Sequence, residues 1–102
     1  GAKKMDFSLP FLTYNEPSNE IRWTESQPVL LDFLIANCEL SPDGYSVLLT
    51  IDGKTTGTIT SWQPYYIYGL AKGKHKIRLQ LMNKKSQVPG LFNDVERTIT
   101  VR

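Results

Sequence analysis

Apolar and polar residues alternate with the two-residue period of β-strands along the second half of the chain. Residues 75–82 show this most clearly, with apolar side chains at every second position: Ile77, Leu79 and Leu81. Residues 45–51 lead into Asp52-Gly53, and a threonine-rich run follows at 54–60. An Asp-Gly pair between two such runs is typical of a two-residue hairpin turn. The pattern predicts strands throughout this half of the chain.

Further strand-like runs occur before and after this region. We expect them at residues 7–14, 20–24, 28–38, 62–68 and 95–101. The run 28–38 is apolar on both faces, which favours a central strand covered on both sides, or one whose outer face the N-terminal segment covers. Ser41-Pro42-Asp43-Gly44 predicts a turn in which Gly44 supplies a positive φ. No window of a dozen residues has the apolar spacing of an amphipathic helix.

Seven or eight short strands separated by turn residues predict an all-β fold. We expect an immunoglobulin-like two-sheet β-sandwich in which all strands are antiparallel. The length of 102 residues suits one domain spanning residues 1–102. We expect residues 1–6 to be a disordered leader or a cloning remnant, with the original N-terminus removed.

Composition narrows the function without identifying it. The net charge of +2 is too small to indicate a nucleic-acid partner. Half of the basic residues cluster late in the chain, and we interpret them as a solvated strand face: Lys72, Lys74, Lys76, Arg78, Lys84 and Lys85. The one cysteine excludes an internal disulfide framework. The longest apolar stretch, residues 29–36, is interrupted by Asp32, so no transmembrane segment is predicted.

Few residues are available for catalysis or metal binding. His75 is the one histidine of the chain, and its parity matches the inward face of its strand. We expect it to be half-buried and bonded to turn backbone; the alternative is a metal site made with Cys38 and Met82. A Cys38–His75 dyad lacks a recognisable third group. An inward Arg97 suggests an ion pair with Asp32. We therefore predict no enzyme activity, no metal and no cofactor.

Aromatic residues gather around one predicted strand. They are Trp62, Tyr65, Tyr66 and Tyr68, with Trp23 earlier in the chain. Exposed rings of this kind stack on sugars, and the polar side chain of Gln63 could bond to a sugar edge. The alternative is that the rings pack in the core, where each buries about 150–250 Å². The candidate ligand-binding residues are Trp62, Gln63, Tyr65, Tyr66 and Tyr68.

The segment 66–81 resembles the end of bacterial immunoglobulin-like and fibronectin type III-like domains. It reads YIYGLAKGKHKIRLQL and is followed by a TITV finish at 98–101. The stretches LLDFLIAN at 30–37 and QVPGLFN at 87–93 are also similar to bacterial cell-envelope proteins, many of them lipoproteins. This resemblance implies a β-sandwich of the immunoglobulin-like or fibronectin type III-like kind, in agreement with the strand pattern. It also implies a bacterial source.

The resemblance implies a non-catalytic binding or spacer module of an envelope or secreted protein. The expected location is periplasmic, cell-surface or secreted, with membrane contact only through a removed N-terminal lipid anchor. The expected partner is a protein or a glycan, and no nucleic acid. The alternative function is a carbohydrate-binding module that uses exposed aromatics at residues 62–68.

Overall fold

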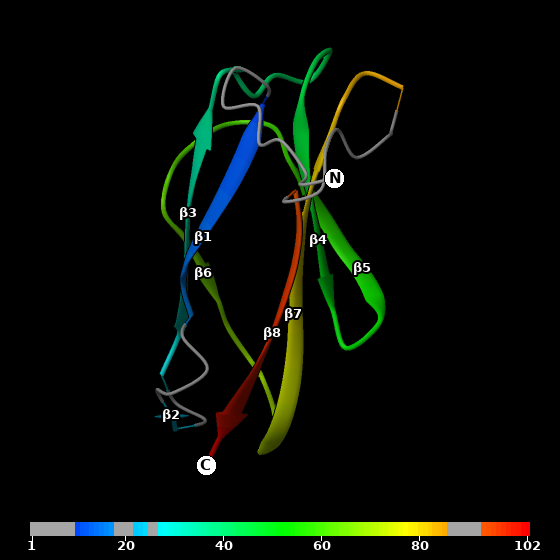
Figure 1. Cartoon of the computed structure of the whole chain (residues 1–102). Helices are drawn as coiled ribbons and strands as arrows, with labels where there is room; N and C mark the ends of the chain where they lie inside the picture. The colour runs from blue at the N-terminus through cyan, green and yellow to red at the C-terminus, as the bar shows by residue number, and fades with distance from the viewer. Residues whose placement is uncertain (1–9, 18–21, 25–26, 86–92) are drawn as a thin grey trace, which may run out of the picture.

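Two β-sheets pack face to face (Figure 1), as the strand pattern predicts. The computed structural model describes residues 10–17, 22–24, 27–85 and 93–102. The three-stranded sheet has the order β1 (Phe11–Glu16), β3 (Val29–Ala36), β6 (Tyr65–Ile67). The five-stranded sheet has the order β2 (Arg22–Trp23), β8 (Asp94–Val101), β7 (Gly73–Met82), β4 (Ser46–Ile51), β5 (Lys54–Ile59). The expected leader at 1–6 lies outside the described residues.

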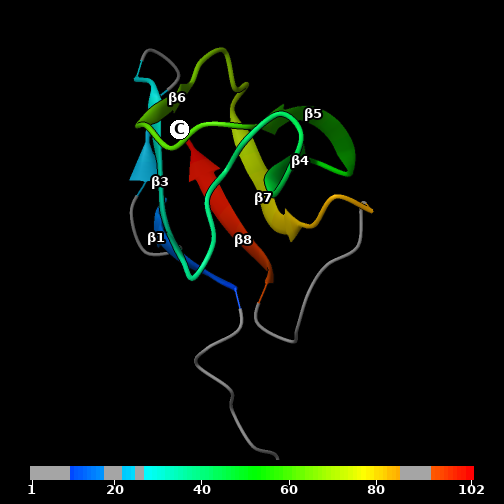
Figure 2. The ribbon, with the colours of Figure 1, turned by 90° about the horizontal axis from the view of Figure 1, so that it is seen from above.

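Every second residue of the long strands enters one shared core. Seen from above, β3 and β6 lie on one side of the sandwich and β4 and β5 on the other (Figure 2). The buried apolar side chains come from both sheets: Leu12, Tyr14, Val29, Leu31, Phe33, Val47, Ile59, Ile77, Leu79, Leu81, Ile99 and Val101. Burying a side chain of this size contributes about 1.5–3 kcal/mol. The alternation predicted for residues 75–82 is confirmed. Within the described ranges no helix is long and apolar enough to cross a membrane.

Both predicted turns are present, but in the turn at residues 41–44 the glycine does not have the backbone conformation that was expected. Asp52 and Gly53 have φ values of 53° and 80°, the left-handed pair that a two-residue hairpin with the twist of its strands requires. The turn at residues 41–44 closes with the Gly44 N–H donating to the Ser41 carbonyl at 3.3 Å. Gly44 does not have the expected positive φ. A Cβ at Gly44 would lie 2.6 Å from Ser41 Oγ, and the Ser41 side chain would have to rotate to admit it.

One strand pair departs from the expected antiparallel arrangement. β2 pairs in parallel with β8, through Arg22 opposite Thr100 and Trp23 opposite Val101. β1 and β8 run in the same direction in Figure 1. Because the chain crosses from the small sheet to the large one without reversing, β2 reaches the edge of β8 in parallel.

The outer face of β3 is more open than the sequence suggested. Leu34 is 51% exposed, although the two apolar faces predicted that both would be covered. The reason is the position of β1, which pairs beside β3 within the same sheet and does not lie over it. β1 runs two residues beyond the predicted strand, to Asn15 and Glu16, and begins directly after Pro10.

Arg97 joins β8 to β1, and the predicted ion pair between Asp32 and Arg97 is wrong. The guanidinium donates to the backbone carbonyls of Tyr14, Asn15 and Pro17 at 2.7, 3.0 and 3.2 Å. It also stacks on the Tyr14 ring, 4.4 Å from the centroid. The bulge between Tyr14 and Glu16 interrupts the β1–β3 ladder beside these carbonyls, and Arg97 satisfies them.

Asn93 forms a second link between the two ends of the chain. Its side chain is 1% exposed. Its Oδ1 accepts the Leu12 N–H at 2.8 Å, and its Nδ2 donates to the Pro10 carbonyl at 2.9 Å. Its own carbonyl accepts the Leu81 N–H at 2.8 Å. The start of β1 is therefore held to the start of β8 by a buried amide.

Candidate functional site

The aromatic segment begins in a loop and ends just beyond a short strand. β6 covers only Tyr65–Ile67, so Trp62 and Gln63 precede it and Tyr68 follows it. The expected strand from residue 62 is shorter because Pro64 has no N–H to donate to a ladder. β6 pairs with the first part of β3, with Tyr66 opposite Leu30.

Three of the predicted rings are on the surface. Trp62 is 57% exposed, Tyr66 54% and Tyr68 74%. Tyr65 and Ile67 point the other way and pack against the core. The Tyr65 hydroxyl donates to the Ser61 carbonyl at 2.8 Å and lies 3.4 Å from the Gln63 side-chain nitrogen. Tyr65 and Gln63 thus hold the loop, and Trp62, Tyr66 and Tyr68 face solvent. The side chain of Trp23 is outside the described set.

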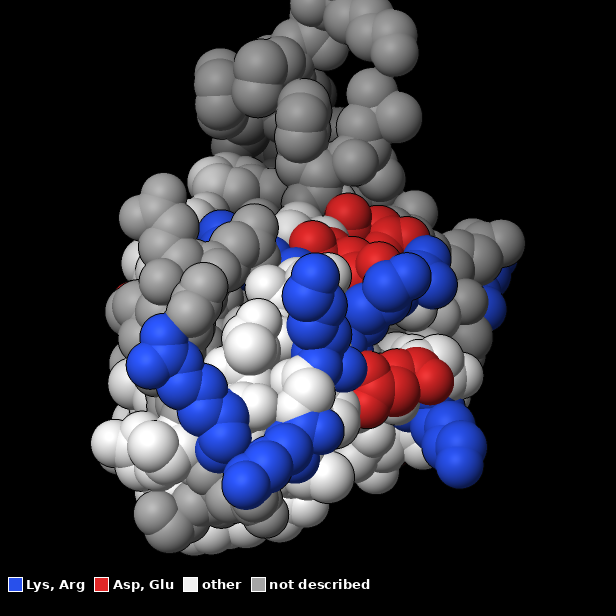
Figure 3. All heavy atoms as spheres, turned by 90° about the horizontal axis from the view of Figure 1, so that it is seen from below, with Lys and Arg blue, Asp and Glu red and all other residues white. Residues whose placement is uncertain are grey.

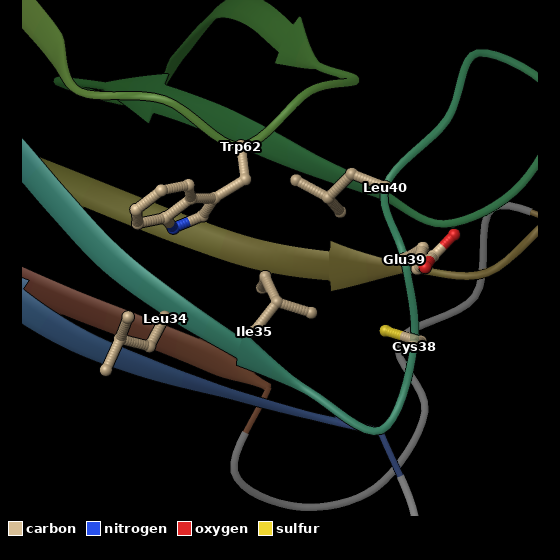
Figure 4. A pocket seen from close by; sticks show the side chains of 6 residues that line it. All are labelled: Leu34, Ile35, Cys38, Glu39, Leu40 and Trp62. Carbon is tan, nitrogen blue, oxygen red and sulfur yellow. The ribbon is translucent and has the colours of Figure 1, made fainter.

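The Trp62 ring is fixed although it is exposed. Its indole N–H donates to the Phe33 carbonyl of β3 at 2.8 Å. This contact replaces the strand hydrogen bond that β6 would make if it extended further along β3. The ring therefore lies along the edge of β3, where Figure 4 shows it.

A pocket of about 330 Å³ opens beside the Trp62 ring (Figure 4). Its lining is mainly apolar, with one carboxylate: Leu34, Ile35, Cys38, Glu39, Leu40 and Trp62. Burial raises the pKa of the Cys38 thiol above its ordinary value. The order of residues in the chain does not bring the lining together, because two strands of the other sheet, β4 and β5, lie between Trp62 and the other lining residues. The apolar outer face of residues 28–38 was the one signal that pointed here.

His75 makes the backbone contact that was expected and one more. Its Nε2 lies 2.6 Å from the Ala71 carbonyl, and its Nδ1 lies 2.6 Å from Asp52 Oδ2. The Ala71 carbonyl and the ionised Asp52 carboxylate both accept, so the two contacts favour the protonated ring, which has an N–H on each nitrogen. The hydrogen bonds to Asp52 and then to Ala71 raise the pKa of His75. Burial alone would raise the pKa of Asp52, but the bonds from His75 and the Lys76 N–H lower it.

The structure does not bring His75 and Cys38 together. Cys38 follows the upper end of β3 in Figure 1, whereas His75 lies near the lower end, where β7 begins. No group of three or more His, Cys, Asp or Glu side chains placed to hold a metal occurs in the part of the chain that the structure describes. The Cys38–His75 dyad and the shared metal site are therefore not formed.

The basic residues are interleaved with acidic ones. Arg78 Nε donates to Asp94 Oδ1 at 2.7 Å across the β7–β8 pair. This hydrogen bond raises the pKa of Arg78 and lowers that of Asp94. Figure 3 shows basic and acidic side chains side by side on the lower end of the molecule. The predicted solvated strand face is confirmed by the exposure of Lys72, Lys74 and Lys76, and its acidic partner Asp94 was not predicted.

Comparison with solved structures identifies the fold. The structure of the Clostridium thermocellum CbhA fibronectin(III)-like modules superposes with a TM-score of 0.70. The two share 12% sequence identity, over 90% of this chain and 97% of that one. No protein-family model and no curated protein sequence matches this chain. The chain has a fibronectin type III-like fold, consistent with the resemblance of residues 66–81.

Proposed function

We propose that this chain is a non-catalytic binding module of a bacterial envelope or secreted protein. It contacts its partner through the aromatic surface, which we define as Trp62, Tyr66 and Tyr68 with Leu34, which lines the same pocket as Trp62. The exposure of these four side chains, from 51% to 74%, carries the proposal. They are the large hydrophobic residues that the described part of the chain leaves exposed, and large exposed apolar groups mark interaction sites.

Geometry also supports a binding role for this surface. The Trp62 ring is held by its bond to Phe33, and Tyr66 is placed by the pairing of β6 with β3. Rings that are already ordered lose little conformational freedom when a partner docks, which favours affinity. The Trp62 ring is thus presented to a partner in a preorganised position.

A glycan is the second candidate partner. Exposed indole and phenol rings offer flat apolar faces with polar tips, the arrangement that stacks on a sugar ring. The exposure of Trp62, Tyr66 and Tyr68 favours this candidate. It requires the rings to contact a sugar directly, so each ring should contribute to affinity.

A tryptophan-fluorescence titration tests both candidates. The folded domain is titrated with soluble glycans, envelope polysaccharides and an array of extended peptides, and the titration is repeated with Trp62→Ala. A saturable shift with a glycan, lost in Trp62→Ala, assigns a sugar-binding module. A shift with peptides alone assigns a protein-binding module. No response to any probe overturns the binding proposal and leaves a spacer.

The matched control for this titration is Thr58→Ala. Thr58 is exposed on β5, in the other sheet, so its replacement should leave every titration unchanged. Circular dichroism of both variants shows whether the sandwich is intact.

A further inference from the structure

The second half of β3 has one edge that no strand covers. β1 pairs with β3 from Asp32 to Ala36. On the opposite edge, β6 pairs only with Val29, Leu30 and Leu31. The edge of β3 beyond Leu31 therefore faces the Trp62 loop instead of a neighbouring strand.

Hydrogen-bond directions show which groups point to this edge. The Phe33 carbonyl points there, because it accepts the Trp62 indole N–H. On β1, the Leu12 N–H points away from β3, because it donates to Asn93. In an antiparallel ladder, hydrogen-bonded and non-hydrogen-bonded pairs alternate, so Leu12 and Ile35 form a non-hydrogen-bonded pair.

Ile35 therefore presents both its N–H and its carbonyl to the open edge. Among the described residues, none outside the sheet ladders forms a backbone hydrogen bond with either group. Unpaired strand groups of this kind act as a template for another strand. The groups open on the pocket beside Trp62, whose lining includes the Ile35, Leu40 and Cys38 side chains (Figure 4).

We propose that this pocket is a β-strand addition site for an extended peptide segment of a partner protein. The backbone of the segment pairs with the N–H and carbonyl of Ile35. One apolar side chain of the segment enters the pocket between Leu40 and the Trp62 ring. Main-chain bonds supply affinity and the side-chain pocket supplies selectivity, as in other complexes formed by strand addition.

The pocket fits a peptide in three respects. The Ile35 N–H can donate to a peptide carbonyl, and the Ile35 carbonyl can accept a peptide N–H, as in a pair of neighbouring strands. The apolar lining suits an aliphatic side chain. Glu39 lines the rim and is exposed, so a basic residue beside the inserted side chain adds a weak ion pair. The inference rests on the proposed binding function, and it assigns the partner class and the contact.

Disulfide tethering to Cys38 provides the test, because it is the one cysteine of the chain and lines the pocket. Acetylated, amidated hexapeptides, each with one cysteine present as its mixed disulfide with 2-mercaptoethanol, are equilibrated with the protein and 2-mercaptoethanol at mildly alkaline pH. The Cys38 thiolate attacks the peptide sulfur and releases 2-mercaptoethanol as the leaving thiol. Intact mass measures retention. Peptides with alternating apolar residues should be retained about tenfold better than acetyl-cysteine amide, because binding raises the effective concentration. Equal retention of all peptides overturns the proposal.

Backbone methylation of the best peptide identifies the contact. Each amide nitrogen is methylated in turn, which removes one N–H and leaves the side chains unchanged. Retention should fall at the one position whose N–H donates to the Ile35 carbonyl, since the next carbonyl along this edge, that of Phe33, already accepts the Trp62 indole N–H. Equal sensitivity at all positions, or at none, would show that side chains alone hold the peptide and would overturn strand addition.

Amide hydrogen exchange at Ile35 gives an independent measure. The amide should exchange quickly in the free protein and become protected when the peptide is tethered. Slow exchange in the free protein would reveal an internal partner and overturn the proposal.

The variant Tyr66→Thr/Tyr68→Thr separates this proposal from the one it rests on. It should retain the tethered peptide, because neither ring lines the pocket. If the double variant abolishes glycan or protein binding and keeps the peptide, the two contacts are distinct. If no probe binds the aromatic surface and the peptide is still retained, only the role of the exposed rings fails.

Discussion

The two central strands, β3 and β7, both have an apolar inner face, but their outer faces differ in polarity. Both bury three apolar side chains at alternate positions, for example Phe33 in β3 and Leu79 in β7. The outer face of β7 carries Lys74, Lys76, Arg78 and Gln80, whereas that of β3 carries Leu30, Asp32, Leu34 and Ala36. The inner faces pack together to form the core of the sandwich. The outer faces set the polarity of the surface that a partner can contact. The candidate site lies on the sheet whose outer face is apolar.

The largest expected loss of stability comes from replacing side chains on the inner faces of β3 and β7, which pack in one core. Phe33→Ala and Leu79→Ala each remove a side chain that is at most 1% exposed, one from each sheet. Each should lower the free energy of unfolding by about 2–5 kcal/mol through lost burial and cavity formation. Urea unfolding followed by circular dichroism measures this. If one sheet melted first, as a separate transition, the two sheets would not share one core.

Arg97 connects the two regions, and its loss should be the next largest effect. Arg97→Leu leaves three backbone carbonyls, two in β1 and one just after it, without their donor. Because hydrogen bonds to charged groups are worth about 1.5–3 kcal/mol, we expect a loss of this size in urea unfolding. Arg97→Lys keeps the charge and loses the fork of donors, so it should recover part of the stability. If Arg97→Lys were as stable as the parent protein, the positive charge alone would account for the stabilisation, and the fork of guanidinium donors would not be needed.

The pH dependence of stability should follow His75 and Asp52, on the large sheet. The pKa of His75 is higher in the folded state than its ordinary 6.5, so its contribution is complete below that value and is lost as pH rises through the folded pKa. The pKa of Asp52 is lower than its ordinary 3.8, so its contribution is lost as pH falls through the folded pKa. Urea midpoints should therefore be highest at mildly acidic pH.

The variant His75→Gln is the control for this prediction. It should remove the decline in stability between mildly acidic and alkaline pH, and NMR titration of His75 in the parent protein should give a pKa above 6.5. A His75 that titrates below that value would contradict the paired, doubly protonated ring.

The charged face of β7 should contribute little. Arg78→Ala removes the pair with Asp94, and both side chains are more than one third exposed. The expected loss is within about 1 kcal/mol, because solvent and salt screen exposed pairs. Unfolding in low and high salt measures it, and the loss should shrink as salt increases. A salt-independent loss would mean that Arg78 contributes through packing.

The smallest stability effect should come from the aromatic surface. Tyr66→Thr and Tyr68→Thr should each change the free energy of unfolding by less than about 0.5 kcal/mol, since both rings are mainly exposed. The same variants should reduce partner binding if the proposed function holds. A large loss of stability would show that these rings serve the fold and would weaken their assignment to binding.

Local signals in the sequence predicted most of the fold. The Asp52-Gly53 turn and the alternation in residues 75–82 depend on neighbouring residues, and both were placed correctly. The exposure of Tyr66 and Tyr68 on either side of the more buried Ile67 follows the same two-residue period. Each of these features is determined within a few residues of chain.

Features that depend on distant residues could not be predicted in this way. The carbonyls that Arg97 contacts lie in or next to β1, about 80 residues earlier, so its inward parity led to the wrong partner. Asn93 precedes β8, where no periodic pattern marks a buried amide. The pocket needs both the end of β3 and the Trp62 loop, which meet only in the folded molecule.

The link from β8 to β1 through Arg97 also determines how the domain would bear a pulling force. β1 starts at the upper end of the sandwich and the chain ends at the lower end (Figure 1). Tension between these two ends would drag β1 and β8 past each other along their length. The three Arg97 bonds and the two side-chain bonds of Asn93 would then be loaded together in shear and would not open one at a time. The two side chains would act as a mechanical clamp.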